Sequence, residues 1–192
     1  MGFADHVAAL VKKDKSPPYA VVGLDGGVSY WHRRVSGEDR LSMLLDEVIP
    51  LCARRFKLGG GGGRGRAIIG WSMGGYGALV AAETEPQLLS AVVAVSPAVW
   101  TSYAAMMLGP RDAFDGAADF AKYDVIGHAG RLAGVDVRVD CGKQDPFYGY
   151  VTYLEAALPQ PPSGGYSPGG HDHEYWGRVA PAEAEFIGRA LA

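Results

Sequence analysis

Residues 67–78 read AIIGWSMGGYGA, and this stretch decides the fold. An apolar run typical of a buried strand leads into a G-x-S-x-G pattern centred on Ser72, and a helical pattern rich in Ala and Gly follows and ends before Pro86. In this strand–turn–helix setting the pattern predicts a nucleophile elbow, a sharp turn that exposes a serine at the end of a strand. Gly70 and Gly74 are expected there because side chains at those places would collide with the neighbouring strand and helix.

The helix after Ser72 would point its N-terminus at the serine, where free N–H groups and the helix dipole favour a developing negative charge. The backbone N–H of Met73 is therefore a candidate oxyanion donor. Gly75 and Gly77 are expected to let this helix approach the sheet closely. The pattern as a whole predicts a serine that attacks an acyl carbonyl group.

A serine hydroxyl needs a base to remove its proton and an acid to orient that base, in the chain order Ser, Asp or Glu, His. Asp145 follows a strand pattern at 135–141 in an Asp-Pro turn, and Asp140, inside the strand pattern, is its competitor. Two late histidines are candidate bases: His171, which follows two glycines, and His173 as the alternative. The pair could also bind a metal, but a metal site normally has three protein ligands, so neither a metal nor a cofactor is predicted.

Short apolar strand patterns alternate with helical patterns, which predicts an α/β fold with a mostly parallel sheet flanked by helices. The predicted strands are 20–24, 67–70, 91–95 and 135–141. A helix is predicted over 40–56, with a kink or break at Pro50, and another at the C-terminus. The Gly-rich run 59–63 predicts a flexible loop. The stretch 98–132 fits either a substrate lid or ordinary crossover helices.

The chain of 192 residues, of which 48% are hydrophobic, predicts a single domain over 1–192. A formal net charge of −3 with scattered Lys and Arg argues against nucleic acid as a partner. No apolar run of about 18 residues occurs, so no membrane span is expected. The sequence as given predicts a cytoplasmic protein, or a secreted one if an upstream signal segment has been lost. Cys52 and Cys141 are expected to be free thiols.

Four stretches together resemble the esterase family of α/β-hydrolases, which includes esterase D, also called S-formylglutathione hydrolase, and the antigen 85-type mycolyltransferases. They are 70–78, 96–98, 141–147 and 169–172. The resemblance implies an α/β-hydrolase fold and a Ser72–Asp145–His171 triad. Such a triad cleaves small-molecule carboxylic esters or thioesters through an acyl-enzyme. Trp71 and Trp100 are the expected substrate contacts.

Two alternatives to hydrolysis stay open. An acyltransferase of the mycolyltransferase type would use the same triad and pass the acyl group to an alcohol instead of water. A catalytically inactive hydrolase-like binding protein is the other alternative. The base also stays open, because the family places an aromatic residue at the second position after its histidine. Here His173 stands at that position for His171, and Tyr175 stands there for His173.

At the N-terminus the sequence departs from the family pattern, in which a strand and a His-Gly-type loop precede the first helix. That loop supplies a second oxyanion N–H, but residues 2–11 already predict a helix. We therefore expect a domain that is N-terminally truncated relative to the family and lacks the N-terminal strands. A missing N-terminal segment, or a partner in a homo-oligomer, would complete the sheet. The Pro- and Gly-rich stretch 159–166 predicts a weak last strand.

Overall fold

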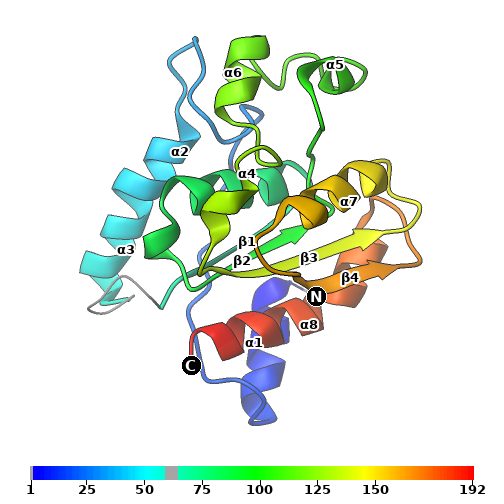
Figure 1. Ribbon diagram of the computed structural model, residues 1–192. Helices are drawn as coiled ribbons and strands as arrows, with labels where there is room; N and C mark the ends of the chain where they lie inside the picture. Colours follow the sequence, from blue (N-terminus) through cyan, green and yellow to red (C-terminus); the bar gives the residue numbers. More distant parts are fainter. Residues whose placement is uncertain (1, 59–64) are drawn as a thin grey trace.

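Four parallel strands form one sheet in the order β1-β2-β3-β4 in the computed structural model, which describes residues 2–58 and 65–192 (Figure 1). The strands are β1 (Ala67–Trp71), β2 (Ala91–Val95), β3 (Asp136–Gly142) and β4 (Ser163–Ser167). The strands predicted over 67–70, 91–95 and 135–141 are confirmed, and so is the α/β class. The Gly-rich loop predicted at 59–63 lies outside the described residues.

Helices cover both faces of the sheet, as Figure 1 shows. On one face α4 (Met73–Thr84) packs on β1 and β2, and α7 (Tyr148–Ala157) packs on β3. On the other face α8 (His173–Ala190) packs on β1, β2 and β3, and α1 (Phe3–Lys12) packs on α8. Side chains of the fully buried β2 alternate between the two faces: Val92 and Ala94 join the larger core on the α4 side, and Val93 joins the smaller core under α8.

The predicted strand at 20–24 is wrong. Its residues run as irregular chain, and the side chains of Val21 and Val22 are 43% and 50% exposed. A short apolar run becomes a strand only where a neighbouring strand accepts its backbone hydrogen bonds. Within residues 2–58 and 65–192, β1 pairs with β2 alone. Completion of the sheet by another segment or by a partner stays a prediction.

The helix predicted over 40–56 forms as three consecutive pieces. They are α2 (Arg40–Ser42), the π-helix η1 (Met43–Val48) and α3 (Ile49–Phe56). Pro50 lies in the first turn of α3, where a missing N–H is tolerated. The break expected at Pro50 is therefore taken up by a change from π-helical to α-helical hydrogen bonding.

The stretch 98–132 holds only short helical pieces, on the α4 side of the sheet (Figure 1). They are α5 (Tyr103–Met106), α6 (Ala117–Lys122) and the 3-10 turn η3 (Ala129–Leu132); a further 3-10 turn, η2 (Pro86–Leu88), follows α4. The last strand, β4, forms at the sheet edge although it contains Gly164 at φ +93°. A Cβ on Gly164 would overlap the carbonyl oxygen of Val139, so this close approach to β3 requires a glycine.

Candidate active site

Ser72 occupies the sharp turn between β1 and α4 with φ +55° and ψ −120°, a backbone conformation that residues other than glycine rarely adopt. Its N–H donates to the carbonyl oxygen of Val95 over 2.9 Å. A Cβ on Gly70 would overlap the backbone of Gly74, so glycine is required two places before the serine. A Cβ on Gly74 itself would meet nothing within 4 Å, so the expected collision at that position is wrong.

Two further glycines of α4 serve different neighbours. A Cβ on Gly75 would lie 3.0 Å from the carbonyl oxygen of Gly70 and 3.2 Å from Pro97, so Gly75 does bring the helix close to the strand ends, as expected. Gly77 instead makes room for the indole ring of Trp31, which a Cβ at that place would overlap. The expectation that Gly77 serves the approach to the sheet is therefore wrong.

His171 lies between Ser72 and Asp145. Its Nε2 is 2.8 Å from Ser72 Oγ, and its Nδ1 is 2.8 Å from Asp145 Oδ2. The Asp145 side chain is fully buried, and its other oxygen accepts the N–H of Phe147 over 2.8 Å. Burial alone would raise the pKa of Asp145, but hydrogen bonds from His171, the Phe147 N–H and Ser96 hold that pKa below its ordinary value. A buried carboxylate that stays ionised fits a histidine that must accept a proton.

The loop before His171 is fixed to the turn that carries Asp145. Gln144 accepts the N–H of Gly169 on its side-chain oxygen over 2.8 Å, and its own backbone N–H donates to the Gly169 carbonyl over 3.0 Å. Gly169 has φ +145°, which favours glycine. Directly after His171, Asp172 caps α8 by accepting the N–H of Tyr175 over 2.8 Å. The chain is thus fixed on both sides of His171, by Gln144 before it and by the Asp172 cap after it.

The two competitors of the sequence analysis lie elsewhere. Asp140 points its carboxylate at Arg138, which donates to it through Nε over 2.6 Å and through Nη2 over 3.0 Å. His173 is the exposed first residue of α8, and its ring lies edge-on to Trp176 at 5.1 Å. Among the residues that the structure describes, the Ser72 hydroxyl is hydrogen-bonded to His171 and to neither of these two competitors.

The predicted oxyanion donor, Met73, and the predicted substrate contacts, Trp100 and Trp71, occupy three different places in the fold. Met73 is the first residue of α4, whose first N–H groups have no acceptor within the helix. Trp100 is buried in the larger core and lies 5.5 Å from the ring of Phe147, which in turn lies 5.3 Å from the ring of His171. Trp71 packs edge-on to Phe3 of α1, on the α8 side of the sheet.

Sequence reasoning missed three side chains around the centre: Gln144, Ser96 and Trp176. Trp176 lies edge-on to His171 at 5.2 Å, and its Nε1 donates to Ser96 Oγ over 3.1 Å. The only sequence signal for Ser96 and Gln144 was their position inside the stretches that resemble the family, and Trp176 lies just beyond the last of those stretches. Within the described ranges no group of three or more His, Cys, Asp or Glu could hold a metal, and Cys52 and Cys141 are both free thiols. No helix in those ranges is long and apolar enough to cross a membrane.

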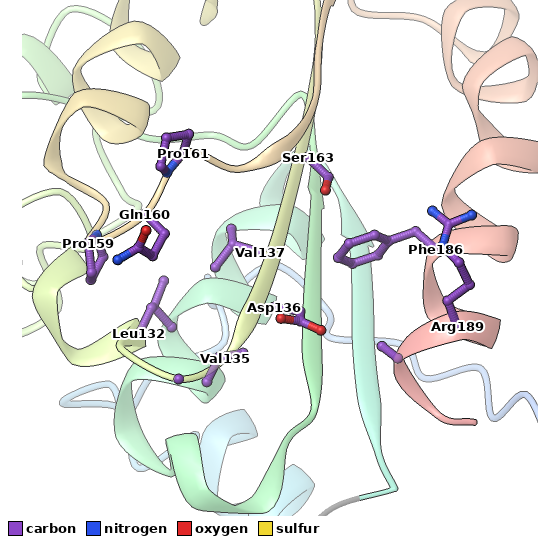
Figure 2. Close-up of a pocket in the computed structure, with 12 residues that line it drawn as sticks. Leu132, Val135, Asp136, Val137, Pro159, Gln160, Pro161, Ser163, Phe186 and Arg189 are labelled. Carbon is purple, nitrogen blue, oxygen red and sulfur yellow. The ribbon is translucent and has the colours of Figure 1, made fainter.

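A hollow of about 420 Å³ lies far from Ser72, where β3 and β4 begin (Figure 2). Pro159, Gln160 and Pro161 line one side of it, and Phe186 and Arg189 of α8 line the other. Ser72, Asp145 and His171 follow the opposite, carboxyl ends of the strands, which is where open parallel sheets bind their ligands. The Ser72 end of the sheet, and not this hollow, is therefore the candidate active site.

A family model described as "Putative esterase" matches residues 6–182. No curated protein matches the chain. Among solved structures, a ferulic acid esterase superposes with a TM-score of 0.76 at 21% identity, covering 98% of this chain and 76% of that one. An S-formylglutathione hydrolase from Agrobacterium tumefaciens gives a TM-score of 0.64 at 18% identity, covering 92% of this chain and 71% of that one.

A third solved structure, Mycobacterium tuberculosis MPT51 (FbpC1), gives a TM-score of 0.69 at 18% identity, covering 87% of this chain and 75% of that one. At these identities the structural likeness establishes a shared fold. The family model covers most of the chain and supports ester hydrolysis as its reaction. The chain therefore belongs to the esterase family of α/β-hydrolases, as its sequence predicted.

Proposed function

We propose that this protein is a serine esterase that cleaves carboxylic esters, thioesters among them, through an acyl-enzyme on Ser72. The proposal rests above all on one observation: His171 is 2.8 Å from Ser72 Oγ through one ring nitrogen and 2.8 Å from Asp145 through the other. A base within about 2.6–3.2 Å of a hydroxyl is within reach of its proton. The buried carboxylate orients the ring and stabilises the imidazolium that forms.

In the first half-reaction Ser72 Oγ attacks the acyl carbonyl carbon while His171 Nε2 takes the hydroxyl proton. The carbonyl electron pair moves onto oxygen, where the N–H of Met73 at the start of α4 would donate to it. The tetrahedral intermediate collapses, the alcohol or thiol leaves with the proton from His171, and the acyl group stays on Ser72. Water then attacks this acyl group by the same route and releases a carboxylic acid and free serine.

The substrate wall that we propose is apolar. Phe147 and Trp176 lie against the His171 ring at 5.3 Å and 5.2 Å, and Trp100 lies behind Phe147. Such rings favour an uncharged acyl or alcohol group over a charged one. Contact of Trp100 and Trp71 with substrate remains part of the proposal, to be tested by their replacement with Ala.

The test compares wild type with Ser72→Ala and with Ser36→Ala, a matched control at an exposed serine. Wild type and Ser36→Ala should hydrolyse p-nitrophenyl acetate and react with a fluorophosphonate probe. Ser72→Ala should lose at least about a thousandfold in kcat and show no labelling. Mass spectrometry of quenched reactions should find the acetyl group on the peptide that contains Ser72.

Three outcomes would redirect or end the proposal. Absence of Ser72-dependent labelling in folded wild type would end it and leave the inactive binding protein. Labelling without hydrolysis, relieved by an added alcohol that receives the acyl group, would assign acyl transfer instead. Turnover that survives Ser72→Ala would place the nucleophile at another residue.

A further inference from the structure

Ser96 stands directly after β2, fully buried, with φ +45°. A non-glycine residue keeps such a backbone only where its surroundings hold it there. Here the Ser96 N–H donates to the carbonyl oxygen of Asp140 in β3 over 2.7 Å. This backbone arrangement fixes the place at which the Ser96 side chain leaves the chain, and the hydroxyl lies among the groups of the candidate active site.

The hydroxyl of Ser96 joins two of those groups. Trp176 Nε1 lies 3.1 Å from Ser96 Oγ, and because an indole N–H can only donate, Ser96 is the acceptor in this bond. The single proton of the hydroxyl is then available for another acceptor. The Ser96 side chain is also one of the groups that hold the pKa of the Asp145 carboxyl below its ordinary value. An ionised carboxylate can only accept a hydrogen bond. The Asp145 carboxylate is therefore an available acceptor for the Ser96 proton that the bond from Trp176 leaves free.

Cys141 is the competing acceptor for the Ser96 proton. Its side chain is fully buried in β3, and burial raises the pKa of its thiol to about 12. Near neutral pH Cys141 is therefore an uncharged thiol, which is a weak acceptor. The ionised carboxylate of Asp145 makes the stronger, charge-assisted bond.

Trp176 touches the site a second time through its ring. The indole lies edge-on to the imidazole of His171, with ring centroids 5.2 Å apart. Trp176 belongs to α8, which starts just after His171 and is capped by Asp172. One side chain thus contacts the base directly and reaches the acid through a single hydroxyl.

We propose that Ser96 and Trp176 are positioning residues that act as a pair, holding Asp145 and His171 in the geometry that Ser72 requires. The proposal rests on the function proposed above and adds two residues to it. Neither residue exchanges a proton with substrate. Ser96 fixes one carboxylate oxygen of Asp145, and Trp176 fixes both the Ser96 hydroxyl and the face of the imidazole. Hydrogen bonds to charged groups of this kind correspond to a loss of about ten- to a hundredfold when they are removed.

The experiment measures kcat and KM for p-nitrophenyl acetate in Ser96→Ala, Trp176→Phe and the double variant. Trp176→Phe keeps an aromatic ring against His171 but removes the indole N–H. Each single variant should lose about ten- to a hundredfold in kcat with little change in KM, because the substrate wall remains. The double variant should lose little more than the worse single variant, because both changes cut the same connection.

Two matched controls make the same chemical changes outside the network. Ser29 is a buried serine and Trp31 a half-buried tryptophan, and neither the Ser29 hydroxyl nor the Trp31 indole N–H has a hydrogen-bond partner in the described part of the chain. Ser29→Ala and Trp31→Phe should therefore keep kcat within a few-fold of wild type. If Ser96→Ala folds poorly, Ser96→Gly accommodates the φ of +45° and removes the same hydroxyl.

The outcomes separate this proposal from the proposed function. Wild-type activity that depends on Ser72 but is unchanged in Ser96→Ala and Trp176→Phe overturns the positioning pair and leaves the esterase. Losses that multiply in the double variant, or that appear in KM alone, also overturn the pair. Wild type without any Ser72-dependent turnover or labelling overturns both proposals.

Discussion

Gly142, the last residue of β3, lies so close to Gly169 that a Cβ on Gly142 would overlap the Gly169 carbonyl. The same hypothetical atom would stand 2.9 Å from the carbonyl oxygen of Gly170, next to His171. The end of β3 therefore carries the Asp145 turn and also seats the loop that presents His171. The distance between Asp145 and His171 therefore depends on the absence of a Cβ atom at Gly142.

Gly142→Ala should push the His171 loop away from β3. We expect a loss of at least about a hundredfold in kcat, because displacement of a catalytic group by about 1 Å has that effect. Overpacking should also lower the free energy of unfolding by about 1–3 kcal/mol. Gly149→Ala is the matched control, since a Cβ there meets nothing within 4 Å in α7. Equal activities of the two variants would contradict the prediction that a side chain at position 142 displaces the His171 loop.

Gly70→Ala and Gly74→Ala separate the two glycines of the G-x-S-x-G pattern. A Cβ on Gly70 would overlap the Gly74 backbone, whereas a Cβ on Gly74 has open space. We expect Gly70→Ala to lose at least about a hundredfold in activity and to unfold at lower temperature. Gly74→Ala should stay within a few-fold of wild type, because alanine suits the first turn of a helix. Esterase assays and thermal unfolding of both variants test this, and equal damage at the two positions would refute it.

Much of this architecture could be predicted from local patterns in the sequence. The runs of β1 and β2 are apolar enough to identify strands, and β3 is identified by apolar residues that alternate with polar ones. The G-x-S-x-G pattern locates the turn at Ser72. The run 20–24 has the same apolar character but no strand partner in the part of the chain that the structure describes, and pairing between distant segments leaves no local signal. For the same reason the contact between Ser96 and Trp176, which are 80 residues apart, could not be predicted. The residue types in the sequence were enough to select Ser72, Asp145 and His171 as candidates. The residues that position them can be identified only in the folded structure.

Asp145→Asn and Asp140→Asn distinguish the two carboxylates of this region. Asp145→Asn should lower kcat by about 10³–10⁴-fold, because an amide cannot hold the His171 ring in the tautomer that accepts the serine proton. Asp140→Asn leaves the half-buried Arg138 without its charged partner. We expect that variant to lose about 1–3 kcal/mol of stability while its activity per folded molecule stays within a few-fold of wild type. Steady-state kinetics and denaturant unfolding measure both effects, and the reverse pattern would make Asp140 the acid.

Glu183 makes the stability of the protein depend on pH. Its side chain is fully buried in α8, and neither carboxylate oxygen has a hydrogen-bond partner among the residues that the structure describes. Burial, and after it the charge of nearby Asp140, raise the pKa of Glu183 from 4.5 to about 8, and Arg138 opposes the shift. Below about pH 4.5 the folded and unfolded chains both hold this proton. From about pH 4.5 to 8 the unfolded chain releases the proton while the folded chain keeps it, so the stabilisation is lost as pH rises, by at most about 1.4 kcal/mol per pH unit.

We therefore expect Glu183→Gln to unfold at a higher temperature than wild type at pH 8 and to lose that advantage at pH 5. Glu185→Gln, an exposed change on the same helix, should leave the pH dependence of the wild type intact, and an identical pH profile for Glu183→Gln and wild type would refute the assignment.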